Sequence, residues 1–200
     1  MKVFRSALVI IGLAGGSAFA GDFSFTGDFT NDDEVQPFSF TVTENFAEVT
    51  LRTWSYAGGT NAAGAEIARG GFDPILTLFD ASTGALINEN DDGHMTIDPL
   101  TGNGYDSFLM NYFDAGSYIA TVTQFESYAI GPLLSNGFVG SANSNFDNRD
   151  SHWAFDIVNV SSASAGAPYI SPIPEPGILA MFLAGLGLLG WRTRSARAQL

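Results

Sequence analysis

Apolar and polar residues alternate with a period of two through much of the middle of the chain. Residues 38–42 and residues 49–52 both follow this pattern, and a short polar segment at residues 43–45 separates them. Because successive side chains of a β-strand point to opposite faces, such a run places one apolar face against a core. The two runs and the turn-like segment between them predict a β-hairpin.

Similar short runs follow along the chain, and no long helical run lies between them. Aromatic residues make up 13% of the sequence, which favours strands over helices. We therefore expect an all-β chain that folds as an antiparallel β-sandwich of jelly-roll type. A second hairpin is expected within residues 75–87. The eight predicted strands are residues 23–26, 38–42, 49–52, 75–79, 86–87, 108–112, 117–124 and 152–160.

The first twenty residues have the three parts of a Sec-type signal peptide. Lys2 and Arg5 form a basic start, residues 7–15 are apolar, and residues 18–20 read Ala-Phe-Ala. The apolar part is shorter than a membrane span, and the Ala-x-Ala pattern is typical of a signal-peptidase site. We therefore predict export through the Sec translocon and cleavage after Ala20.

A Pro-Glu-Pro triplet, an apolar run and a group of arginines follow one another near the C-terminal end of the sequence. The triplet is Pro174, Glu175 and Pro176, and residues 177–191 carry no charge. As a helix this run would measure ~22 Å, against a hydrocarbon core of ~30 Å, so it is short for a lasting membrane anchor. The arginines that follow, expected to stay on the cytoplasmic side, are Arg192, Arg194 and Arg197.

This order of triplet, short apolar helix and arginine cluster resembles the PEP-CTERM sorting signal of Gram-negative bacteria, over residues 173–198. The resemblance implies transient anchoring in the inner membrane. It also implies processing by exosortase, a membrane-embedded enzyme, at or near the triplet, and then release or attachment at the cell surface. Proteins with this signal are associated with exopolysaccharide and biofilm. The alternative is a plain C-terminal membrane anchor.

The chain therefore divides into four parts. Residues 1–20 form the signal peptide, and residues 21–160 form one β-sandwich domain. Residues 161–172 are mostly small and can bury little surface, so they are predicted to be a linker. Residues 173–200 form the sorting segment, with its motif, short transmembrane helix and arginine cluster.

The central region is strongly acidic and contains no cysteine. Between residues 21 and 173, three arginines face twenty acidic residues, which leaves a net charge of about −17. Such a charge repels phosphate backbones and argues against nucleic acid as a partner, whereas it attracts divalent cations. Without cysteine, neither a disulfide framework nor a thiolate metal site can form.

Four aspartates are candidate calcium ligands. The densest polar segment is residues 88–93, and other acidic residues are expected in adjacent loops. Calcium takes six to eight oxygen ligands in irregular geometry, although the spacing here is not that of an EF-hand. The alternative is that these residues form solvated turns, since Asp and Asn are ordinary turn formers. The candidate ligands are Asp73, Asp91, Asp92 and Asp106.

No catalytic motif is present, so we expect the protein not to be an enzyme. The sequence has two histidines and no His-Glu-x-x-His or Gly-x-Ser-x-Gly pattern. A pair of carboxylates for glycoside cleavage stays open as an alternative, because that pairing is spatial. Aromatic side chains could stack on sugar rings or pack in the core. The aromatic candidates are Trp54, Tyr56, Tyr105 and Tyr128.

The central region also resembles bacterial pre-peptidase C-terminal-like domains, in residues 38–42, 71–80, 90–93 and 115–122. This resemblance implies a non-catalytic β-sandwich accessory domain, often adhesive or carbohydrate-associated. We therefore expect an exported, exosortase-processed protein of the cell surface or extracellular matrix, without enzymatic activity and associated with exopolysaccharide or biofilm. The alternatives are a secreted polysaccharide-active hydrolase and a membrane-anchored binding protein.

Overall fold

The computed structural model describes residues 20–142 and 144–171 of the chain. The predicted signal peptide, except for Ala20, lies outside these residues. The sorting triplet, the predicted short transmembrane helix and the arginine cluster also lie outside them. Within the described residues, no helix has both the length and the apolar character needed to cross a membrane.

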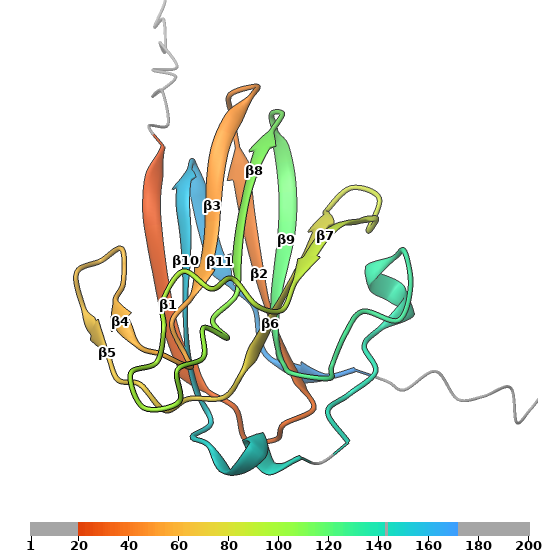
Figure 1. The fold of residues 1–200 in the computed structure, drawn as a ribbon. Helices are drawn as coiled ribbons and strands as arrows, with labels where there is room; N and C mark the ends of the chain where they lie inside the picture. Colours follow the sequence, from red (N-terminus) through yellow and green to blue (C-terminus); the bar gives the residue numbers. More distant parts are fainter. Residues whose placement is uncertain (1–19, 143, 172–200) are drawn as a thin grey trace, which may run out of the picture.

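Two antiparallel sheets make up the fold (Figure 1). The first sheet has the strand order β1-β10-β3-β8. The second has the order β11-β2-β9-β6-β7, and β12 also pairs with β2. The strands of the first sheet are β1 (Gly21–Asp28), β3 (Ala47–Thr53), β8 (Phe108–Phe113) and β10 (His152–Val160). Those of the second are β2 (Glu34–Val42), β6 (Pro74–Asp80), β7 (Leu86–Asn90), β9 (Gly116–Gln124), β11 (Ser162–Ala165) and β12 (Tyr169–Ile170).

The core lies between the two sheets and is rich in phenylalanine. Inward-facing residues alternate along each strand, as Phe38 and Phe40 of β2 and Leu51 of β3 illustrate. Phe38 packs against Phe155 of β10 with ring centroids 4.7 Å apart, so the contact joins the two sheets. The period of two in the sequence therefore reflects the packing of a two-layer sandwich.

Each of the eight strands predicted from the sequence is present, but the first predicted hairpin is wrong. β2 pairs with β9, whereas β3 pairs with β10 and β8, so the two strands lie in opposite sheets. The alternation of apolar and polar residues determines which face of a strand is buried, but it does not determine which other strand pairs with it. The second predicted hairpin is confirmed, because β6 pairs with β7.

Residues 54–70 cover part of the outer face of the first sheet and include the short hairpin of β4 (Gly59–Thr60) and β5 (Glu66–Ile67). The indole of Trp54 donates a hydrogen bond of 2.7 Å to the buried carboxylate of Asp156 on β10. This carboxylate also accepts bonds from the Ser24 hydroxyl and the Ala62 amide. Short 3-10 turns, η1 (Leu134–Asn136) and η2 (Asn145–Asn148), interrupt the long connection before β10.

The predicted linker at residues 161–172 is largely part of the second sheet. Its strands β11 and β12 both pair with β2 and cover the edge of that strand. The small residues of this segment give no hydrophobic period, and the pairing depends on main-chain hydrogen bonds, which every residue except proline can donate. The folded domain therefore extends to Ser171, the last residue described.

Candidate functional site

Three of the four predicted calcium ligands meet at one end of the second sheet. Asp73 directly precedes β6, and Asp91 and Asp92 directly follow β7. Since the two strands are antiparallel neighbours, the start of β6 lies beside the end of β7. One carboxylate oxygen from each of the three residues lies within 4.8 Å of the other two.

This acidic cluster, Asp73, Asp91 and Asp92, is electrostatically unfavourable. Burial and the charges of Asp91, Asp92, Asp106 and Asp147 together raise the pKa of Asp73 to about 8, and burial has the largest effect. Burial also raises the pKa of Asp91, against the hydrogen bond of 2.6 Å that the Tyr128 hydroxyl donates to it. Such like-charged groups favour either protonation or a bound cation.

Two oxygen atoms of the cluster are buried without a hydrogen-bond partner among the described residues, namely Oδ1 of Asp73 and Oδ1 of Asp91. Buried polar atoms are normally paired, so these two need a proton, a water or a metal ion. Hard oxygen ligands of this kind suit calcium. The three carboxylates therefore fit a candidate cation site at this end of the second sheet.

Asp106, the fourth predicted ligand, has a different role. Its carboxylate accepts hydrogen bonds from the main-chain amides of Tyr56 and Ala57, at 3.0 and 2.8 Å, and from the hydroxyl of Thr53 at 3.2 Å. Asp106 is 2% exposed and does not belong to the group of three that converge. Burial raises the pKa of Asp106, whereas these hydrogen bonds lower it.

A separate ion pair joins three connecting segments. Asp98 is fully buried and accepts two hydrogen bonds from Arg69, at 2.8 and 2.6 Å. The guanidinium of Arg149 lies 3.8 Å from Asp98 and stacks 3.6 Å from the ring centre of Tyr56. The Arg69 hydrogen bonds hold the pKa of Asp98 well below its usual range. We regard this arrangement as structural, because its polar atoms are used to hold loops together.

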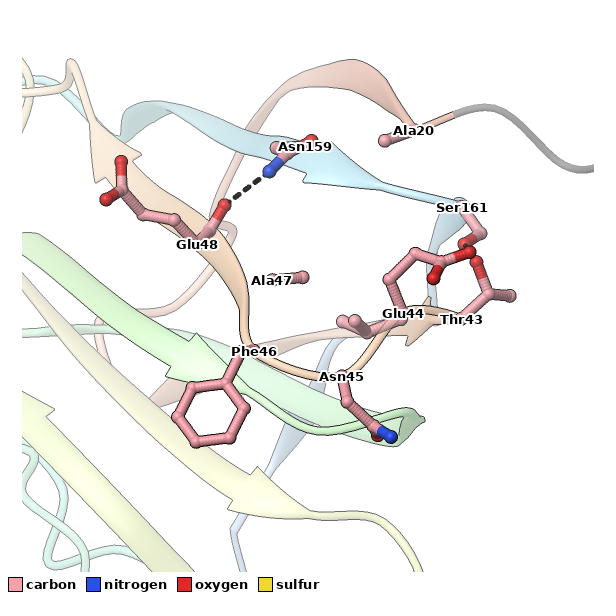
Figure 2. Close-up of a pocket in the computed structure, with 10 residues that line it drawn as sticks. Ala20, Thr43, Glu44, Asn45, Phe46, Ala47, Glu48, Asn159 and Ser161 are labelled. Carbon is pink, nitrogen blue, oxygen red and sulfur yellow. Dashed lines mark hydrogen bonds between the residues drawn. The ribbon is translucent and has the colours of Figure 1, made fainter.

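A groove of about 330 Å³ lies at the other candidate site, where residues 43–46 connect β2 to β3 (Figure 2). Residues 42–48 form one side, and Asn159 and Ser161 form the other. The Asn159 side chain donates a hydrogen bond of 2.6 Å to the main-chain oxygen of Glu48 across the groove (Figure 2). Ala20, the predicted last residue of the signal peptide, also lines this groove.

Phe46, in the segment that connects β2 to β3, has an unusual conformation and exposure. Its side chain is 81% exposed, and its φ of 58° is in the left-handed region that few bulky residues adopt. In Figure 2 its ring points away from Asn159 and Ser161. An exposed aromatic ring held in an unfavourable backbone conformation is a functional candidate.

The aromatic residues singled out from the sequence are occupied by internal contacts. Tyr56 is buried, with its ring centre 4.9 Å from that of Tyr105. Trp54 lies under the guanidinium of Arg52, and Tyr128 is bonded to Asp91. Among the described residues, the exposed aromatic side chains are instead Phe46, Tyr112 and Tyr169, at 81%, 65% and 37%. Alternation marks Tyr112 as outward-facing, but no sequence pattern marks Phe46.

The comparisons with known proteins bear on the segment that follows the sandwich. No curated protein matches the chain. Residues 172–197 match the PEP-CTERM protein-sorting motif, and this range contains both the Pro-Glu-Pro triplet and the arginine cluster. The chain therefore carries a PEP-CTERM sorting motif directly after its all-β domain, which implies export, a transient C-terminal membrane anchor and processing by exosortase.

Proposed function

We propose that the mature protein is a non-enzymatic component of the cell surface or extracellular matrix that associates with exopolysaccharide. The observation that carries this proposal is the sorting motif that begins directly after the last described residue of a folded sandwich. A chain exported by the Sec translocon and sorted in this way delivers its domain outside the inner membrane. The domain's own surface then determines what it binds.

The arrangement of strands supports a binding role. Eight strands form two sheets in the orders β1-β10-β3-β8 and β2-β9-β6-β7, which we infer to be a jelly roll. Lectin domains are among the proteins built in this way. The resemblance of the central region to pre-peptidase C-terminal-like domains favours the same accessory role.

Three of the buried acidic groups have a structural role rather than a catalytic one. Asp98, Asp106 and Asp156 are each at most 3% exposed and accept two or more hydrogen bonds that hold loops in place. A general acid or base needs a proton-transfer atom that a substrate can reach. We therefore assign these three carboxylates a role in stabilising the fold.

The groove beside residues 43–46 is the proposed sugar contact. It combines an exposed aromatic ring, Phe46, with the carboxylates of Glu44 and Glu48 and the hydroxyls of Thr43 and Ser161. Aromatic faces pack on the apolar faces of sugar rings, and carboxylates and hydroxyls form hydrogen bonds with sugar hydroxyls. The groove volume of about 330 Å³ is within the range of small-ligand sites.

Binding to extracted polysaccharide tests this function directly. Purified residues 21–171 are mixed with exopolysaccharide from the bacterium that makes the protein, and co-sedimentation and released reducing sugar are measured together. The proposal expects sedimentation with the polymer and no release of sugar. Release of sugar in proportion to enzyme and time would instead support the hydrolase alternative.

We also propose calcium as a stabilising ligand of the acidic cluster. The unpartnered buried oxygens of Asp73 and Asp91 support this proposal, since a cation would satisfy both. Binding to the folded state alone raises stability in proportion to RT ln(1 + [L]/Kd). Thermal unfolding is therefore expected at a higher temperature in calcium than in chelator. Equal midpoint temperatures in the two solutions would exclude a calcium site.

A further inference from the structure

We propose that residues 161–171 form a strap that must leave β2 before exosortase can process the sorting motif. This inference rests on the proposed processing of the chain and adds a step to it. In the folded protein, Ser171 is buried and its hydroxyl accepts a hydrogen bond of 2.9 Å from the amide of Phe138. The motif begins at the next residue.

The closed strap leaves little free chain before the Pro-Glu-Pro triplet. Only residues 172 and 173 separate Ser171 from Pro174, so the two can lie at most ~10 Å apart. A chain freed from Val160 onward would span up to ~48 Å. The proposal requires that exosortase bind its substrate as an extended segment, a common mode of peptide recognition, and that this segment include several residues on the domain side of the triplet. The closed strap keeps those residues paired to β2.

The strap is held to β2 mainly by main-chain hydrogen bonds. β11 pairs with β2 in the register Ser162↔Thr41 to Ala165↔Phe38, and β12 adds Tyr169↔Val35 and Ile170↔Glu34. Gly166 forms two further hydrogen bonds. Its amide donates to the main-chain oxygen of Pro37, and its own main-chain oxygen accepts from the Gln36 side chain. Figure 1 shows β11 beside β2, at the side of the sandwich near β10.

The side chains of the strap contribute little burial. Ala163 is the strap residue that packs against the core cluster, whereas Ser162, Ser164 and Ala165 are exposed. Tyr169 and Ile170 are 37% and 58% exposed. Segments with few buried apolar contacts open at a lower free energy than the rest of a fold. Opening the strap would therefore expose little apolar side-chain surface.

The junction that would act as the hinge is short. Ser161 alone separates β10 of the first sheet from β11 of the second. Two residues before it, Asn159 has a φ of 67°, in the left-handed region. Hinges are commonly a few residues at the ends of elements that absorb a backbone change. Opening of the strap would therefore require a backbone change at this junction.

A disulfide across the edge tests the strap in the full chain. Ser39 and Ser164 are Cα partners, and both are exposed on the outer face, so the double variant Ser39→Cys/Ser164→Cys locks the strap without entering the core. The natural chain has no cysteine to mispair. The matched control, Thr50→Cys/Met110→Cys, joins β3 to β8 and leaves the strap free. Precursor and product are followed by pulse-chase in cells with and without exosortase.

The locked chain is expected to be processed at least about tenfold more slowly than the control disulfide, with reductant restoring the rate. Inserting ten Gly/Ser residues after Ser171 supplies up to ~34 Å of reach and is expected to restore processing of the locked chain. Equal processing rates for the locked and control chains would overturn the proposal. A locked chain whose processing the insertion does not restore would overturn it as well. If the natural chain is not processed even with exosortase, the proposed function itself fails.

Discussion

Replacing Asp73 by asparagine is expected to stabilise the protein in the absence of calcium. The carboxylate is largely buried beside Asp91 and Asp92, and its pKa is raised from 3.8 to about 8. In the unfolded chain the same group is ionised above pH 4. The folded protein therefore takes up a proton between about pH 4 and pH 8, and its free energy of unfolding falls as pH rises through that window.

The size of the effect follows from the pKa difference. At about 1.36 kcal/mol per pKa unit, keeping Asp73 neutral at pH 7 costs at most about 4 kcal/mol. Water reaches part of the cluster, so we expect roughly half of this, about 2 kcal/mol, to be recovered in the variant. For a domain of this size that corresponds to a rise in Tm of about 4–8 °C.

The assay is thermal unfolding of Asp73→Asn and the natural protein at pH 5 and pH 8, in chelator and in excess calcium. In chelator the variant should be the more stable protein, with the larger gain at pH 8. In calcium the natural protein should recover its deficit and the variant should change little. Asp28→Asn removes the same charge from an exposed position and serves as the control. A variant that is less stable than the natural protein in chelator at pH 8 would refute the reasoning.

Three further predictions concern stability and binding. Asp98→Asn should lower the free energy of unfolding by about 2–3 kcal/mol at pH 7, because it removes a buried partner of Arg69. Denaturant unfolding should show this loss shrinking as the pH falls below about 4, because the carboxylate then becomes protonated in the unfolded chain while its lowered pKa keeps it ionised in the folded protein. Gly27→Ala should cost about 1–3 kcal/mol, since an added Cβ would lie 2.5 Å from the Trp153 ring; an unchanged denaturation midpoint would contradict this packing. Phe46→Asn should keep or slightly raise the melting temperature, because Asn tolerates a positive φ, while lowering retention on exopolysaccharide severalfold; unchanged retention would exclude this ring as a sugar contact.

The sequence predicts the strands well because their side chains alternate. β9 and β10 carry the period of two that a buried face requires, whereas β6 is a nearly continuous apolar run that is buried on both faces. The same signal does not identify partners, which is why β2 and β3 were expected in one hairpin and lie in opposite sheets. β11 could not be predicted for a different reason. Its serines and alanines give the strand no strongly apolar face, and its pairing depends on main-chain hydrogen bonds.

The acidic cluster could be predicted in part. Asp73, Asp91 and Asp92 flank a hairpin that the sequence indicates, so their convergence follows from antiparallel pairing. The role of Asp106 could not be predicted, because it depends on amides that residues 56 and 57 present from a distant segment. The exposure of Phe46 likewise depends on a connection between sheets whose path no local pattern sets.

Mass spectrometry of the mature protein, isolated from the bacterium that makes it, tests the central claim most directly. The account predicts a chain that begins at Gly21 and has lost the apolar run and arginine cluster of residues 177–197, with its new end at or near Pro174–Pro176. It also predicts that the same preparation from cells without exosortase retains those residues. A mature protein that still carries Trp191 and Arg192 in the presence of exosortase would contradict sorting and identify the C-terminal segment as a lasting anchor.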